Sequence, residues 1–263
     1  MAQTSYMSGT ERAHPDPVVR RIGIADLKAA LAKGYQDFSE TPTQLVFLCV
    51  IYPLVGLVAA RAASGGALLP LLYPLVAGLS LMGPVAALGI YELSRRREQG
   101  LTSSWLNAFD VLRSPAIGSI AALGLVLAGL FVLWLFAAQA VYRATLGYAL
   151  PDSFWDLIGL VLTTAAGWKL ILWGNLVGFF FAVAVLMLTV VSFPLLLDRD
   201  VGIVTAVRTS IRAVLANPVP MAAWGIIVAV LLALGSLPLF VGLAVVMPIL
   251  GHATWHLYRA VVA

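Results

Sequence analysis

The chain has 263 residues, of which 61% are hydrophobic and only 11% are charged, and its mean hydropathy is +0.98. Soluble domains use roughly 45–50% apolar and 25% charged residues, so this composition excludes a soluble globular protein and indicates an integral membrane protein. The formal net charge of +4 comes from basic residues beside the apolar blocks. Membrane orientation explains these residues better than nucleic-acid binding, and we expect no nucleic-acid partner.

The first 21 residues are polar, contain Pro15 and Pro17, and lack the apolar core and the cleavage site of a signal peptide. We expect residues 1–21 to be a disordered cytoplasmic tail and residues 22–263 to form one membrane domain. An amphipathic helix should follow the tail, since apolar residues recur at helical spacing. Its predicted apolar face contains Ile24, Leu27, Leu31, Tyr35 and Phe38.

Six apolar segments have the composition of membrane-spanning helices, and they show no period-two alternation of the kind found in transmembrane barrels. They cover about 45–60, 68–93, 117–141, 170–197, 221–235 and 238–258. The apolar block 154–166 has 13 residues, fewer than the roughly 17 needed to cross the hydrocarbon. We interpret it as an interfacial or re-entrant helix on the outer face, the alternative being the first part of a long fourth helix.

Two further amphipathic segments precede later spans. The segment 100–113 groups Leu101, Trp105, Ala108, Phe109 and Leu112 on one side. The run after Gly202 places five apolar residues on one helical face, namely Val204, Val207, Ile211, Val214 and Leu215. Its other face carries Thr205, Arg208, Thr209 and Arg212. Each segment has the pattern of a helix lying along a membrane boundary.

The three amphipathic segments suggest a threefold internal repeat. Each ends in a capping residue and a proline, at Thr41-Pro42, Ser114-Pro115 and Asn217-Pro218, and each leads into an apolar hairpin. The repeat units are about 22–97, 98–197 and 198–263. The predicted fold is therefore an all-α, polytopic membrane bundle of six transmembrane helices, arranged as three hairpins that each follow a cytoplasmic amphipathic helix.

The basic residues predict the orientation of this bundle. Of the 16 lysines and arginines, 13 lie on one side of the predicted spans, and only Arg61, Arg143 and Lys169 lie on the other. By the positive-inside rule, both termini and all amphipathic segments are cytoplasmic, and we expect the bacterial inner membrane. The residues predicted to contact anionic headgroups or a partner are Arg95, Arg96, Arg97, Arg208 and Arg212.

Two stretches resemble a known family. They are Phe193-Pro194-Leu195-Leu196-Leu197-Asp198-Arg199-Asp200, which leads to Asn217-Pro218, and the final Gly251-His252-Ala253-Thr254-Trp255-His256-Leu257-Tyr258. The chain resembles the uncharacterised bacterial six-helix membrane proteins called domain of unknown function 2189, over about residues 22–263. It is more loosely similar to the membrane domain of some glycerophosphodiester phosphodiesterases. Some family members carry a label similar to cytochrome oxidase subunit I. The resemblance therefore implies that a membrane-protein complex, such as a respiratory complex, is a candidate partner.

Metal binding has few candidate ligands. His252 and His256 are four residues apart on one helical face, and the carboxylates of Glu92 and Asp198 end neighbouring hairpins on the same side. The histidines also suit an interfacial role beside Trp255. One helix cannot supply imidazoles to both faces of a haem. We therefore predict no metal and no cofactor.

The remaining polar residues of the spans favour packing. Gly174 and Gly178 form a pair of small residues four apart, with Asn175 beside them, and this pattern is typical of close helix packing with an interhelical hydrogen bond. A conduction pathway usually has charged residues near the centre of the membrane, and no predicted span carries one there. No phosphate loop, zinc-protease motif or serine nucleophile elbow occurs, and we predict that the protein is not an enzyme.

Two functions remain open from the sequence. The first is a non-enzymatic accessory or scaffold protein of the inner membrane that binds partner proteins or lipids through its cytoplasmic amphipathic helices. The alternative is a transporter or lipid-handling protein with a pocket between the hairpins, which a polar cavity near Asn175 and Gln139 would favour.

Overall fold

The computed structural model describes residues 17–40, 69–102, 104–238 and 241–263. Its first half contains α1 (Ile24–Glu40), η1 (Leu69–Leu71), α3 (Leu72–Leu81), α4 (Gly83–Ala86), α5 (Leu88–Glu98) and the 3-10 helix η2 (Trp105–Arg113). The second half contains α6 (Ile117–Leu146), α7 (Phe154–Thr163), α8 (Ala165–Thr189), α9 (Ser192–Asp198), α10 (Gly202–Ala216), α11 (Pro218–Ser236) and α12 (Leu243–Val261). Residues 1–16 of the predicted tail, the predicted first span 45–60 and the Thr41-Pro42 cap lie outside the described residues. Residues 17–21 of that tail are described, and within them the amide of Arg20 donates a hydrogen bond to the carbonyl of Val261 at 2.7 Å.

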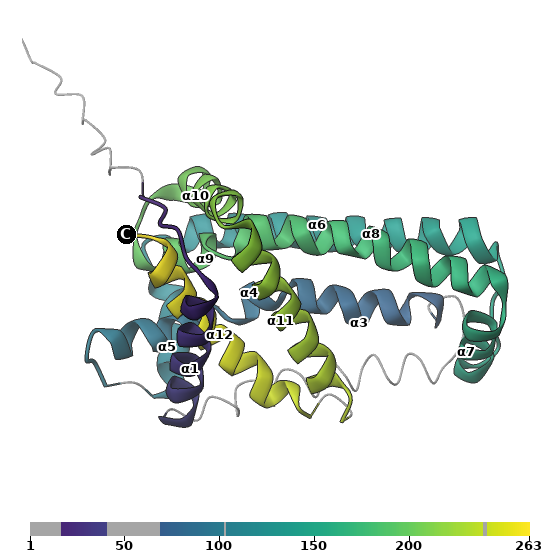
Figure 1. Ribbon diagram of the computed structural model, residues 1–263, viewed down its shortest axis with the longest axis horizontal. Coiled ribbons are helices and arrows are strands. Elements are labelled where there is room, and N and C mark those ends of the chain that lie inside the picture. The colour runs from purple at the N-terminus through teal and green to yellow at the C-terminus, as the bar shows by residue number, and fades with distance from the viewer. Residues whose placement is uncertain (1–16, 41–68, 103, 239–240) are drawn as a thin grey trace, which may run out of the picture.

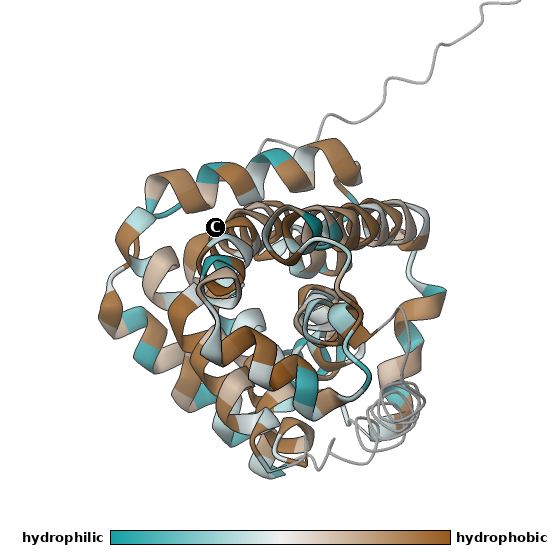
Figure 2. Ribbon diagram, turned by 90° about the vertical axis from the view of Figure 1, so that its right-hand side faces the viewer, coloured by the Kyte–Doolittle hydropathy of each residue, from teal (hydrophilic) through white to brown (hydrophobic). Residues whose placement is uncertain are grey.

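Among the described helices, three are long and apolar enough to cross a membrane. They are Ile117–Leu146, Ala165–Asp198, which combines α8 and α9, and Pro218–Ser236. Figure 1 shows α6 and α8 side by side along the long axis of the molecule. Leu125, Phe136, Leu172 and Phe180 on these two helices are all more than 60% exposed, and in Figure 2 the bundle is hydrophobic on its outer as well as its inner sides. An outer surface of this kind suits lipid and would be costly in water.

The helix α7 is separate from α8, as the interfacial or re-entrant interpretation of residues 154–166 requires. The backbone of Thr164 is extended, and its side chain accepts a hydrogen bond from the amide of Gly167 and so caps the start of α8. A side chain at position 167 would collide with the carbonyl oxygen of Val161, so the glycine permits α7 to fold back against α8. With 10 residues, α7 is about 15 Å long and cannot cross a hydrocarbon core of about 30 Å.

The predicted second span is not one helix. It is divided into η1, α3, α4 and α5, with breaks at Met82 and Ala87. Pro84 lies in the first turn of α4, where its missing amide hydrogen removes a bond that would continue α3. A similar break separates α8 from α9 just before Pro194, whereas Pro248 is accommodated inside α12.

The far end of the molecule from α7 is an assembly of short helices, which we call the polar end. It is formed by α1, α5, η2, α9 and the last turns of α12, and α5, α9 and α12 all contact one another there. The first and last described segments of the chain meet at this end, since Val19 pairs with Val262 as an isolated β-bridge. Asn217 adds a second tie, because its side chain accepts a hydrogen bond from the amide of Ile22 and donates one to the carbonyl of Arg20.

The all-helical membrane architecture is confirmed in this coarse form. The count of six spans and the threefold repeat stay predictions. α12 is not among the helices apolar enough to cross, since its second half carries His252, His256 and Arg259.

Candidate functional site at the polar end of the bundle

Close packing of α1 on α12 carries a charged side chain into the interior. The buried face of α1 contains Leu27, Ala30, Gly34 and Asp37. A Cβ atom added at Gly34 would lie 2.6 Å from the backbone nitrogen of Ala253, so only glycine permits this approach of the two helices. Asp37, one turn further along the same face, is therefore 6% exposed and meets the C-terminal half of α12.

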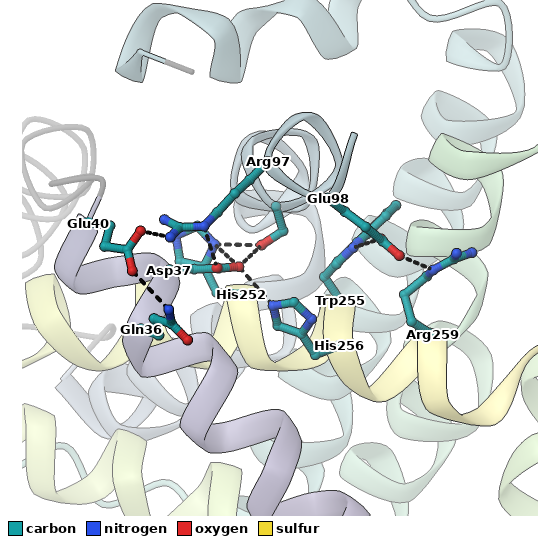
Figure 3. Close-up of polar contacts among 10 residues, drawn as sticks. Gln36, Asp37, Glu40, Arg97, Glu98, His252, Trp255, His256 and Arg259 are labelled. Atoms are coloured by element: carbon teal, nitrogen blue, oxygen red, sulfur yellow. Dashed lines mark hydrogen bonds and ion pairs between the residues drawn. The ribbon is translucent and has the colours of Figure 1, made fainter. Parts of the chain in front are cut away.

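Asp37 is the centre of a cluster from three helices, shown in Figure 3. Its Oδ2 accepts hydrogen bonds from Nε2 of His256 at 2.8 Å and from the hydroxyl of Ser94 at 2.9 Å. Its Oδ1 lies 3.0 Å from Nε of Arg97, which also pairs with Glu40. Nδ1 of His252 lies 2.6 Å from the hydroxyl oxygen of Ser94. We call these six residues the Asp37 cluster.

The hydrogen-bond pattern determines the protonation of His252. The hydroxyl of Ser94 donates its hydrogen bond to Asp37, so the oxygen of this hydroxyl accepts a hydrogen bond from His252. The imidazole of His252 therefore carries its hydrogen on Nδ1. Nε2 of His252 is then a bare acceptor, buried and without a hydrogen-bond partner among the described residues. Burial lowers the pKa of His252 to about 4 although the charge of Asp37 acts to raise it, so this imidazole is neutral near pH 7.

The pKa of the Asp37 carboxyl group is shifted in the direction opposite to that of an isolated buried acid. Burial by itself raises its pKa, but the hydrogen bond from His256 and the nearby histidine charges lower it more. The net result is a pKa below the ordinary value, so Asp37 is ionised near pH 7. A charge in this position is stable because Arg97, His256 and Ser94 all direct hydrogen towards it.

A second polar network ties the last turns of α12 to α5 and α9. Glu98 accepts hydrogen bonds from the indole of Trp255 at 3.0 Å and from Nε of Arg259 at 2.9 Å. Asp198 accepts from the hydroxyl of Tyr258 at 2.6 Å and from Arg259 at 3.3 Å. Arg259 thus bridges two carboxylates from two other helices.

The four residues considered as metal ligands do not come together. His252 and His256 face Ser94 and Asp37, as described above. Glu92 is paired with the guanidinium of Arg95 at 2.8 and 3.0 Å, and Asp198 belongs to the network of Arg259. In the part of the chain that the structure describes, no group of three or more histidine, cysteine or acidic side chains could hold a metal ion.

The basic run at the end of α5 is engaged within the protein. Arg95 pairs with Glu92, Arg97 with Asp37 and Glu40, and Arg96 lies 3.4 Å from Asp110 of η2. All three arginines were expected at headgroups or a partner. Arg97 instead joins α5 to α1 and Arg96 joins α5 to η2, while Arg95 pairs within α5. Arg208 and Arg212 of α10 are exposed.

The helix α10 presents its two faces in an unexpected way. Its buried residues are small, namely Ala206, Thr209, Ser210 and Ala213. The predicted apolar face is turned outward at both ends, with Val204 77% exposed and Leu215 66% exposed, while Val207, Ile211 and Val214 are half-buried. The sequence predicted that these bulky apolar residues bury against lipid or the bundle. Val207 and Val214 pack against the core of the protein, whereas Val204 and Leu215 point away from it. The small residues let α10 approach the bundle closely.

The 3-10 helix η2 repeats this arrangement. Its buried residues are Ala108 and Val111, whereas its large apolar side chains are exposed, namely Trp105, Leu106, Phe109 and Leu112. η2 ends four residues before α6, and α10 ends two residues before α11. Both outward apolar faces therefore lie where a chain enters a membrane-spanning helix.

The predicted packing residues lie on α8. A Cβ at Gly178 would be 3.2 Å from the ring of Trp134, so α6 and α8 approach closely there, but a Cβ at Gly174 would meet no atom within 4 Å. Asn175 accepts a hydrogen bond from the hydroxyl of Tyr73 on α3 at 3.2 Å, which is an interhelical bond of the expected kind.

Sequence reasoning did not find Asp37 or Ser94. The signal for Asp37 was present, since Leu27, Ala30 and Gly34 precede it at helical spacing and form a narrow face of small and apolar residues. The partners of Asp37 lie 57 to 219 positions away, so no local pattern connects them.

Comparison with known proteins supports the membrane assignment. Residues 72–198, from α3 to α9, match the family model described as "Predicted integral membrane protein (DUF2189)". No curated protein and no solved structure matches the chain.

Proposed function

We propose that the chain, whose residues 72–198 match the model of the DUF2189 family of predicted integral membrane proteins, is a non-enzymatic accessory or scaffold protein of the bacterial inner membrane. Its long helices anchor it, and its polar end forms a rigid cytoplasmic platform. The outward faces of α10 and η2 rest in the cytoplasmic leaflet, next to anionic headgroups. The first and last described segments, which meet at Val19 and Val262, belong to the platform. The predicted orientation puts 13 of the 16 basic residues on that side.

The observation that carries this proposal is the orientation of α10. A helix with small residues towards the protein and Val204 and Leu215 outward exposes apolar surface that water would disfavour. The helix leads directly into α11, one of the three membrane-spanning candidates, so the boundary of the membrane is the nearest apolar phase. The exposed Arg208 beside this face suits the anionic headgroup layer, where each basic residue contributes about 1 kcal/mol.

The Asp37 cluster supports a structural role for the polar end. Ser94 is 1% exposed, and its hydroxyl is already shared by Asp37 and His252, so it is not accessible to a substrate. The serine also lies between the acid and the histidine, whereas a hydrolytic triad needs the histidine between the other two. The cluster instead joins α1, α5 and α12 into one unit.

Nitroxide labels on α10 test the proposal in the full chain, reconstituted in vesicles with phosphatidylglycerol. A cysteine replaces Val204 in one variant and the exposed Asp200 in a matched control, both with Cys49 changed to alanine. We expect the label at 204 to be more accessible to oxygen than to a water-soluble nickel complex, and the label at 200 to show the reverse. Nickel accessibility at 204 equal to that at 200 would refute the membrane contact, and a label at 204 shielded from both reagents would indicate a protein partner instead.

A further inference from the structure

A groove between α6 and α8 lies at the α7 end of the molecule, far from the polar end. Its volume is about 330 Å³. The groove is lined by Val141, Ala144 and Thr145 from α6 and by Lys169, Trp173 and Val177 from α8. Both helices are membrane-spanning candidates, so the groove opens towards lipid.

The length of the groove fits one leaflet. Lys169, Trp173 and Val177 follow one another at intervals of four residues, so they form a single stripe along α8. At a rise of about 1.5 Å per residue, the stripe is roughly 12 Å long. Half of a hydrocarbon core of about 30 Å is roughly 15 Å, so a chain lying in the groove would reach from the headgroup level nearly to the membrane centre.

The two ends of the groove differ in chemistry. Lys169 lies in the second turn of α8, near the aqueous boundary, and is exposed. It forms no ion pair in the portion of the chain that the structure describes. The indole of Trp168 is 59% exposed beside it, and the indole of Trp173 is 52% exposed, as is common for side chains at the headgroup level. The deeper lining includes Val141 and Val177. The hydroxyl of Thr145, nearer the boundary, donates a hydrogen bond to the carbonyl of Val141.

A second groove on the other side of α6 has the same organisation. Its volume is about 400 Å³, and it is lined by Leu71, Val132, Leu135, Phe136, Gln139 and Arg143. Here too a basic side chain, that of Arg143 in the last turn of α6, lies at the boundary end of an apolar surface. Arg143 and Lys169 are two of the three basic residues that do not belong to the cytoplasmic side in the predicted orientation.

We propose that the groove between α6 and α8 is a binding site for one phospholipid with an anionic headgroup, whose phosphate lies at Lys169 and whose acyl chain lies against Val141, Ala144 and Val177. The occupant is a lipid because the groove faces the hydrocarbon over most of its length. It is anionic because the cation at the boundary end has no carboxylate partner among the residues that the structure describes. The site is independent of the proposed contact of α10 with the opposite leaflet.

Native mass spectrometry of the full chain in mild detergent tests this site by titration with phosphatidylglycerol and with phosphatidylcholine of the same acyl chains. We expect tighter binding of the first phosphatidylglycerol. Lys169→Gln should weaken that step about fivefold, which corresponds to about 1 kcal/mol, and leave phosphatidylcholine unchanged. Ala144→Phe should fill the groove, abolish the tight step for phosphatidylglycerol and weaken the first binding step of phosphatidylcholine.

Two matched variants serve as controls. Ala122→Phe places the same side chain at an exposed position of α6 outside the groove, and it should bind lipid like the wild type. Lys28→Gln removes an exposed cation from α1 at the polar end and should not change the tight step. Circular dichroism confirms that each variant is folded. Equal affinity for the two lipids, or a tight step that survives in Ala144→Phe, would overturn the proposal.

Discussion

His256 and Asp37 lie 219 positions apart in the chain, yet Nε2 of the histidine donates a hydrogen bond of 2.8 Å to Oδ2 of the aspartate. This bond joins the first described helix to the last, and Arg97 completes it from α5. The contact is what makes the polar end one unit, since the same carboxylate holds three helices that are separate in sequence.

Asp37→Asn should destabilise the protein by about 2–3 kcal/mol. The change removes the charge that compensates Arg97 and weakens the bond to His256, and removing one member of a buried ion pair leaves the other poorly solvated. Chemical unfolding in detergent, followed by circular dichroism, measures the loss. Asp200→Asn, an exposed carboxylate at the same end, is the control and should change stability by less than about 0.5 kcal/mol. Similar effects of the two variants would contradict the cluster.

Acid should weaken the fold through His252. Its pKa in the folded protein is about 4 against an ordinary value of 6.5, so between these pH values the unfolded chain binds a proton that the folded chain does not. Stability should therefore fall as the pH drops from about 6.5 towards 4, by at most about 3.5 kcal/mol for roughly 2.5 pH units at about 1.4 kcal/mol each. The pKa of Asp37 lies below 3.8, so its contribution persists in this range and is lost only at lower pH.

The variant His252→Asn isolates this effect, since an amide nitrogen can still donate towards Ser94 but does not titrate. Its stability should depend much less on pH between 6.5 and 4, while the other groups facing the site, Asp37, Arg97 and His256, are retained. Unfolding at several pH values gives both curves. Parallel curves for wild type and variant would show that His252 is not the group responsible.

Gly34→Ala should loosen α1 from α12. The new methyl group would lie within 3 Å of three atoms of Ala253, two of them backbone atoms, which cannot move without shifting the helix. Limited proteolysis should cut the α1 region faster, and stability should fall by more than about 1 kcal/mol. Gly118→Ala is the matched control, because a Cβ there meets nothing within 4 Å and alanine favours a helix. Equal proteolysis rates in the two variants would argue against the close packing.

Two substitutions on neighbouring residues of α10 distinguish its faces. Ala206 is fully buried, so Ala206→Leu should overpack the contact and lower the thermal unfolding temperature by several degrees. Val204 is 77% exposed, so Val204→Leu should leave that temperature nearly unchanged in detergent. If Val204→Leu were the more damaging of the two, the helix would be rotated relative to the orientation described.

The sequence predicted the helical membrane class, the separate short helix at 154–166 and the extent of α10. It did not predict which face of α10 or α1 contacts the protein. Hydropathy indicates that a residue avoids water, but lipid and the protein interior are both apolar. The sequence alone therefore does not show whether Val204 and Leu215 face the protein or point away from it. Small residues such as Ala206 and Gly34 decide close helix contact by size.

The Asp37 cluster was beyond sequence reasoning for a different reason. His252 and His256 attracted notice through their spacing, but their partner lies on another helix and is fixed only by the packing of α1 on α12. Likewise, Arg95 to Arg97 satisfied the positive-inside rule as a group, and the rule does not distinguish a cation at a headgroup from one paired with Asp37 or Glu92.

The central claim is that the polar end and the α7 end lie on opposite sides of the membrane, and cysteine labelling of Asp152→Cys and Asp200→Cys tests it most directly. Both positions are exposed, and α8 with α9 separates them. In intact cells, with Cys49 replaced by alanine, a membrane-impermeant maleimide should label position 152 and not position 200, and lysis should expose position 200. Labelling of both positions, or of position 200 alone, in intact cells would contradict the account.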